Sequence, residues 1–153
     1  MGPIYTEYAR SAMPDDERAT PVNVLLYSSN RDVRAQVMSA LGRRPARDVP
    51  EITVLETATE PATIRLMDAG GIDLAILDGE AYPGGMGIAR QLKDEIYQCP
   101  PILLLTGRPQ DAWLATWSRA DAVVPRPLSA YDLARAAAEL LRTRLAATSA
   151  AHE

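Results

Sequence analysis

The sequence predicts an α/β fold in which five helices cover a doubly wound parallel sheet of five strands. From Val22 onward, short apolar runs alternate with stretches of helical periodicity. The run Ile72–Leu77 is apolar apart from Asp73, which is typical of a strand with helices on both faces. Connections of helical length join strands in parallel with right-handed crossovers, so alternation of this kind favours one open sheet.

The first half of the chain contains three of the predicted strands. They span residues 22–27, 52–55 and 73–77. The helix after the first strand covers residues 30–41, and Ser29 or Asn30 can cap its start. Gly42 follows its last apolar residue as a stop signal. The next helix accepts Pro61 in its first turn, where a missing N–H breaks no hydrogen bond.

The second half of the chain supplies the other two strands and three helices. The strands are predicted at residues 102–105 and 121–124. One helix covers about residues 86–95, and the next carries Trp113 and Trp117. A Ser-x-x-Asp cap, formed by Ser129 and Asp132, begins a long final helix.

Length and composition indicate one domain. Of the 153 residues, we expect a flexible N-terminal arm at 1–20, an ordered domain at 21–146 and a frayed tail at 147–153. The net charge of −4, without a cluster of Lys and Arg, argues against nucleic-acid binding. No apolar run approaches the roughly eighteen residues that span a membrane. The single cysteine, Cys99, fits a reducing compartment, so we expect a cytoplasmic protein.

Polar residues stand at the predicted carboxyl ends of the strands, where open α/β sheets bind their ligands. They are Ser28, Ser29, Glu56, Thr57, Asp78, Thr106 and Arg126. No glycine-rich phosphate loop follows the first strand, and there is no Gly-x-Ser-x-Gly turn. The only histidine, His152, lies in the predicted tail, which argues against hydrolases with a histidine base and against a zinc site. We therefore expect a protein that is not an enzyme.

Asp78 after the third strand, Thr106 after the fourth and Arg126–Pro127 after the fifth form an ordered set. In this order and spacing the chain resembles, from about 22 to 142, the receiver domain of bacterial response regulators. The resemblance implies a flavodoxin-like sheet with strand order 2-1-3-4-5. It also implies that Asp78 accepts a phosphoryl group from a histidine kinase and that Thr106 then bonds the phosphoryl oxygens. The basic residue pairs with the phosphate, and its bond to the proline is usually cis.

The chain departs from the receiver pattern after the first strand. Receivers carry two acidic residues there, which hold Mg²⁺ with the phosphoacceptor, whereas this chain has Ser28 and Ser29. Since Mg²⁺ favours carboxylates, we expect no cofactor, or weakened Mg²⁺ binding at most. Glu80 compensates in part if it turns inward, and Asp32 is a poorer substitute. Arg126 replaces the usual lysine with a planar fork suited to carboxylates.

We interpret the chain as an atypical receiver that works through protein–protein contacts, with weak or absent phosphorylation. Because it ends soon after the last helix, we expect a stand-alone receiver without a DNA-binding or enzymatic domain. Asp78 and Arg126 would form a standing ion pair that holds one conformation. Two alternatives remain open: a conventional phosphorylation-switched receiver in a two-component phosphorelay, and a small flavodoxin-like ligand-binding protein or enzyme.

The two tryptophans are candidates for a partner-binding surface. Trp113 and Trp117 are four residues apart, so they share a helix face. They fit either a core stripe or an anchor for a protein, since Trp is enriched at the centres of interfaces. We expect an unidentified protein partner or a homodimer. By the resemblance, contact would use this helix, the strand at 121–124 and the final helix.

Overall fold

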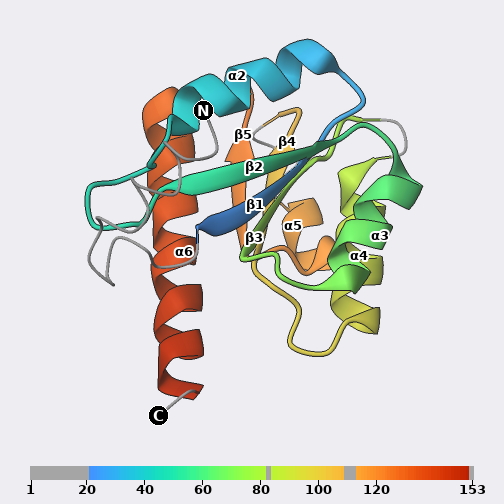
Figure 1. Ribbon diagram of the computed structural model, residues 1–153. Coiled ribbons are helices and arrows are strands. Elements are labelled where there is room, and N and C mark those ends of the chain that lie inside the picture. Colours follow the sequence, from blue (N-terminus) through green and yellow to red (C-terminus); the bar gives the residue numbers. More distant parts are fainter. Residues whose placement is uncertain (1–20, 82–83, 109–112, 152–153) are drawn as a thin grey trace, which may run out of the picture.

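The computed structural model describes residues 21–81, 84–108 and 113–151. The N-terminal arm predicted at 1–20 and the final residues 152–153 lie outside this part. Within it, five parallel strands form one sheet in the order β2-β1-β3-β4-β5, and five helices flank the sheet (Figure 1). The predicted fold class and strand order are confirmed.

The elements carry the labels of Figure 1. The strands are β1 Val22–Tyr27, β2 Ile52–Thr57, β3 Leu74–Asp78, β4 Ile102–Thr106 and β5 Ala122–Pro125. The helices are α2 Arg31–Leu41, α3 Glu60–Ala69, α4 Gly85–Glu95, α5 Trp113–Ser118 and α6 Ala130–Ala151.

Strands β3 and β5 begin one residue later than predicted, and an aspartate precedes each of them. Asp73 Oδ2 accepts a hydrogen bond from the backbone N–H of Asn23 in β1 at 3.0 Å. Asp121 Oδ2 accepts one from the N–H of Ile102, the first residue of β4, at 2.7 Å. Each carboxylate thus satisfies a backbone donor near the start of a neighbouring strand. Lys93 pairs with Asp121 at 2.7 Å and offsets its charge.

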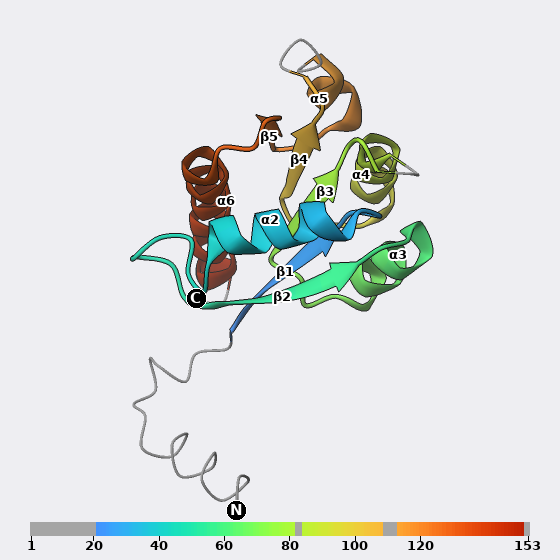
Figure 2. The ribbon, with the colours of Figure 1, turned by 90° about the horizontal axis from the view of Figure 1, so that it is seen from above.

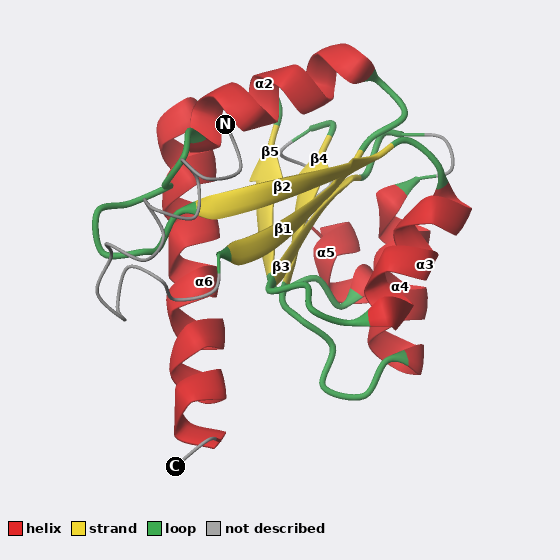
Figure 3. Ribbon diagram, viewed as in Figure 1, coloured by secondary structure: helices red, strands yellow, loops and turns green. Residues whose placement is uncertain are grey.

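Two apolar layers hold the sheet between its helices. The first lies between the sheet and helices α2 and α6, and the second lies on the side of α3 and α4 (Figure 3). Strands β3 and β4 are buried at every position, as expected for strands that are covered on both faces. This double covering leaves the carboxyl edge of the sheet as the place where polar side chains gather.

Helix ends follow the sequence signals, with one extension. The side chain of Asn30 accepts hydrogen bonds from the N–H groups of Asp32 and Val33 and so caps α2. Helix α6 runs through Ala151, into the stretch for which the sequence predicts fraying, and its end projects beyond the sheet (Figure 1). No helix in the described ranges has the length and apolar character needed to cross a bilayer.

A paired arginine ties α6 to the loop between α2 and β2. Arg142 donates two hydrogen bonds to the carboxylate of Asp48, at 2.7 and 2.9 Å. This hydrogen bonding lowers the pKa of Asp48 and raises the pKa of Arg142. Both side chains are exposed, so the pair fixes geometry more than it adds stability.

Two glycines of α4 provide a matched test of its packing. A Cβ at Gly85 would stand 2.7 Å from the carbonyl oxygen of Asp78, whereas a Cβ at Gly87 would meet nothing within 4 Å. We expect Gly87→Ala to raise the free energy of unfolding by about 0.5–1 kcal/mol, since Ala is the better helix former. We expect Gly85→Ala to lower it by about 1–3 kcal/mol through overpacking. Urea unfolding measures both, and equal effects would contradict this account of the helix.

Candidate functional site

The carboxylate of Asp78 is the centre of the candidate site. Asp78 ends β3 and is 2% exposed. Its Oδ2 accepts a hydrogen bond from Ser28 Oγ at 2.8 Å. Its Oδ1 accepts hydrogen bonds from Glu80 N at 2.9 Å and from Arg126 Nη2 at 2.6 Å. Both oxygens are therefore bonded, and the ion pair expected between Asp78 and Arg126 is present.

The sheet topology explains how these distant residues meet. Strands β1, β3, β4 and β5 are parallel, so their carboxyl ends share one edge. Asp78 lies opposite Leu105 in the strand register, and Thr106 is the next residue of β4. The backbone N–H of Arg126 donates to the carbonyl oxygen of Thr106 at 3.0 Å. The Arg126–Pro127 bond is cis, as the resemblance implied.

Two buried polar atoms of the site lack partners. Thr106 is 1% exposed, and its Oγ1 has no hydrogen-bond partner among the described residues. The same holds for Nε of Arg126. An unpaired buried polar group costs about 1–3 kcal/mol of stability. An oxygen acceptor that entered this place could accept hydrogen bonds from both groups and remove that cost.

The two serines after β1 have different environments. Ser28 is fully buried, and its Oγ also accepts a hydrogen bond from Asn30 N at 3.0 Å. Ser29 is exposed. A receiver with acidic residues here would place negative charge beside Asp78, whereas Ser28 supplies a donor that stabilises the Asp78 carboxylate.

The carboxylate of Glu80 lies near the end of β4. A Cβ at Gly107 would stand 2.6 to 2.9 Å from the carboxyl atoms of Glu80, so this carboxylate lies at the end of β4. Strands β1 and β4 flank β3 on opposite sides. The side chain of Glu80 therefore lies on the β4 side of Asp78, whereas Ser28 follows β1 on the other side. Asp32, in the first turn of α2, is exposed.

The donor set around Asp78 does not fit a magnesium ion. Mg²⁺ requires about six oxygen ligands in nearly octahedral geometry and usually binds carboxylates. On the side of Ser28 the ion would find the carboxylate of Asp78, and both of its oxygens already accept hydrogen bonds. In the part of the chain that the structure describes, no three His, Cys, Asp or Glu side chains are grouped closely enough to hold a metal.

Sequence reasoning missed two residues beside the site. Tyr27 is fully buried at the end of β1. Burial raises the pKa of its phenol, and the charges of Glu60 and Asp78 raise it further. Arg34 of α2 donates a hydrogen bond to the carbonyl oxygen of Ser28 at 2.6 Å. It also forms an ion pair with the carboxylate of Glu56 in β2 at 3.0 Å. Tyr27 was detectable as a polar side chain ending an apolar run, whereas nothing local indicates the contacts of Arg34.

The tryptophans of α5 lie on the surface, so the interpretation as a core stripe is wrong. Trp113 is 68% exposed and Trp117 is 48% exposed. The guanidinium of Arg90 in α4 lies 5.1 Å from the centre of the Trp117 ring, and its Nη1 donates to the Trp117 carbonyl at 2.6 Å. Helix α5 packs beside α4 and lies apart from α6 (Figure 2). The exposed tryptophans of α5 therefore lie beside α4, and α4 was not part of the predicted contact face.

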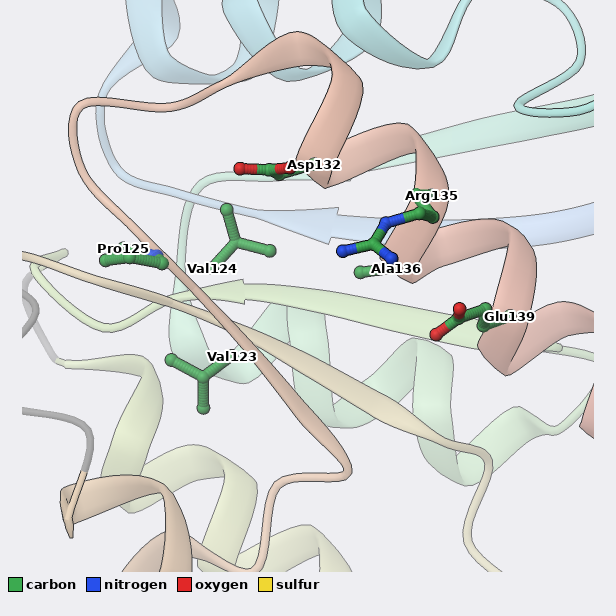
Figure 4. Close-up of a pocket in the computed structure, with 7 residues that line it drawn as sticks. All are labelled: Val123, Val124, Pro125, Asp132, Arg135, Ala136 and Glu139. Atoms are coloured by element: carbon green, nitrogen blue, oxygen red, sulfur yellow. The ribbon is translucent and has the colours of Figure 1, made fainter.

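The other half of that predicted face contains a hollow. It has a volume of about 240 Å³ and lies between β5 and α6 (Figure 4). Strand β5 contributes an apolar wall, and α6 contributes Asp132, Arg135 and Glu139. None of the residues that bond Asp78 lines it.

Comparison with known sequences gives clear relatives. The chain is 59% identical over 131 residues to two uncharacterised response regulatory proteins of Mycobacterium tuberculosis, from strains CDC 1551 / Oshkosh and ATCC 25618 / H37Rv. The alignment covers 85% of this chain and 97% of each relative. No protein-family model matches the sequence.

Solved structures show the same fold at low identity. The receiver domain of an HD domain-containing protein from Pseudomonas fluorescens has a TM-score of 0.70 at 17% identity, covering 84% of this chain and 93% of that one. The chemotaxis response regulator CheY4 of Vibrio cholerae has a TM-score of 0.66 at 19% identity, covering 80% and 100%. The receiver domain of Saccharomyces cerevisiae Ssk1, solved with the phosphotransfer protein Ypd1, has a TM-score of 0.61 at 18% identity, covering 74% and 83%.

The buried ion pair predicts a specific loss of stability. We expect Arg126→Met to lower the free energy of unfolding by about 2–4 kcal/mol, because it leaves the Asp78 carboxylate buried without a counter-charge. The matched control is Arg43→Met, which removes an exposed ion pair with Glu51 and should change stability by less than about 1 kcal/mol. Urea unfolding at pH 7 measures both, and similar losses in the two variants would disprove a special role for the buried pair.

The environment of Tyr27 predicts a pH dependence. Its phenol has a raised pKa in the folded state, above the ordinary value of 10.0. The unfolded chain releases this proton first, so stability from this group is complete below pH 10 and declines as pH rises further. We expect Tyr27→Phe to show a shallower decline above that pH in urea unfolding. Identical slopes for the variant and the original protein would count against this assignment.

Proposed function

The chain belongs to the response regulator family and forms a receiver domain of two-component signal transduction, and on this premise we propose that its Asp78 site is held by a standing ion pair instead of being switched by phosphorylation. The observation that carries the proposal is the carboxylate of Asp78, bonded to Arg126 at 2.6 Å and to Ser28 at 2.8 Å. Output would then pass through contacts with a protein partner.

The ion pair opposes phosphoryl transfer for two reasons. Attack on phosphorus uses a lone pair of a carboxylate oxygen, and three donors occupy three of the roughly four lone-pair positions of Asp78. The transferred group also brings negative charge, which a metal ion neutralises in most phosphoryl-transfer enzymes. The serines supply no charge to hold that ion. We therefore propose that the protein needs no Mg²⁺ in its working state.

A conventional phosphorylation switch is the second candidate, and one observation favours it. Within the described ranges, the hydroxyl of Thr106 and Nε of Arg126 have no hydrogen-bond partner, so a phosphoryl group on Asp78 could use both donors. Such a switch would require the guanidinium of Arg126 to move from carboxylate to phosphate. It would also require transfer without the usual pair of acidic residues.

Contact with other proteins is supported by both halves of the predicted face. The α5 half carries exposed tryptophans, and the α6 half carries the hollow. Asp132, Arg135 and Glu139 present both signs of charge on one helix. A surface of mixed charge can be self-complementary about a two-fold axis, so a homodimer through β5 and α6 is included in the proposal.

Intact-mass measurement with acetyl phosphate and Mg²⁺ tests the proposal. We expect no phosphoryl adduct on the original protein, because Asp78 is engaged and the metal ligands are missing. The double variant Ser28→Asp/Ser29→Asp restores two carboxylates and should gain an adduct that disappears when Asp78→Asn is added. An adduct on the original protein that Asp78→Asn abolishes would establish the conventional switch. A change in the NMR spectrum of the original protein on adding Mg²⁺ and beryllofluoride would also support the conventional switch.

A further inference from the structure

The surface formed by α4 and α5 combines two exposed indoles with basic side chains. We call it the α4–α5 surface and define it by Arg90, Asp94, Trp113, Trp117 and Arg119. The only two tryptophans of the chain lie here, 68% and 48% exposed. Large aromatic side chains left in water are unusual away from binding surfaces, and Trp dominates the energetics of many interfaces.

Helix α4 holds this surface in place. Helix α5 has six residues, too few for a helix that is stable on its own. Arg90 bonds the carbonyl of Trp117 and covers its ring, and Arg119 forms an ion pair with Asp94. These contacts fix Trp117 before any partner arrives. An ordered side chain loses less entropy on binding, which favours its use as an anchor.

The charge of the α4–α5 surface suggests what it binds. Arg119 and Asp94 cancel one another, while Arg90 has no carboxylate partner within the described residues. Among the described residues, one positive charge therefore stands beside the indoles, on a chain whose net charge is −4. Helix α6 also has an arginine near an exposed ring, since Arg135 lies 5.9 Å from the centre of the Tyr131 ring. The difference is that acidic side chains line the hollow between β5 and α6 together with Arg135.

We propose that the α4–α5 surface binds a protein segment that presents a carboxylate beside apolar side chains. The carboxylate pairs with Arg90, and the apolar side chains cover Trp113 and Trp117. The inference deepens the protein contact proposed above, and rests on it for biological meaning. It does not depend on the state of Asp78, because none of these residues bonds that carboxylate.

Tryptophan emission tests the inference directly, since both indoles report from this surface. The probes are a short peptide of leucine, phenylalanine and aspartate, and a counterpart with lysine in place of each aspartate. We expect saturable changes with the acidic peptide that weaken as salt is raised. Arg90→Gln should weaken this binding about fivefold, the loss of one exposed charge pair. Arg43→Gln, at an exposed arginine outside both proposed contact surfaces, should leave it unchanged.

Several outcomes would overturn the inference. Equal binding of the lysine peptide would overturn the charge argument even if Arg90→Gln failed to fold. Equal weakening by Arg43→Gln would overturn it as well. Emission that varies with protein concentration alone would assign the surface to a second copy. A third control is the full-length triple variant Asp15→Asn/Asp16→Asn/Glu17→Gln, measured without peptide. If its tryptophan emission differs from that of the original protein, the α4–α5 surface binds the chain's own N-terminal segment. All these results are independent of the phosphoryl adduct, so the two proposals fail separately.

Discussion

A buried carboxylate at the end of the central strand β3 is the constraint on which the rest of the site depends. Asp78 is 2% exposed, and an isolated charge in such a place is strongly unfavourable. Ser28 after β1, the N–H of Glu80 in the loop after β3 and Arg126 after β5 together satisfy it. The bond between Arg126 N and Thr106 O keeps the arginine at the required edge. One charge thus ties four parts of the chain to one point.

The same fold can carry different chemistry because the sheet only sets where side chains meet. The receiver fold delivers the ends of β1, β3, β4 and β5 to one edge whatever residues stand there. In this chain, that edge holds the buried carboxylate of Asp78, the guanidinium of Arg126 and the hydroxyls of Ser28 and Thr106. Such a set stabilises a resting ion pair more readily than a metal-assisted transfer. The proposal of a non-switching receiver follows from that donor set.

The surfaces of the molecule separate into two regions with different chemistry. The α4–α5 surface is aromatic, and Arg90 there has no acidic partner among the described residues. The hollow between β5 and α6 has an apolar wall and mixed charges. The two regions could therefore select different partners. None of the residues that define the two regions bonds Asp78, which is consistent with the proposal of a receiver that does not switch.

The sequence by itself determined the α/β class, the positions of the strands and the edge at which Asp78, Thr106 and Arg126 meet. Apolar runs and caps are local signals, and parallel connections follow from their alternation. Tertiary structure alone decided that Glu80 turns toward β4, that Trp117 packs under Arg90, and that Ser28 bonds Asp78. These contacts join residues from separate elements, and their direction depends on packing between strands and helices. No local pattern along the chain encodes such a direction.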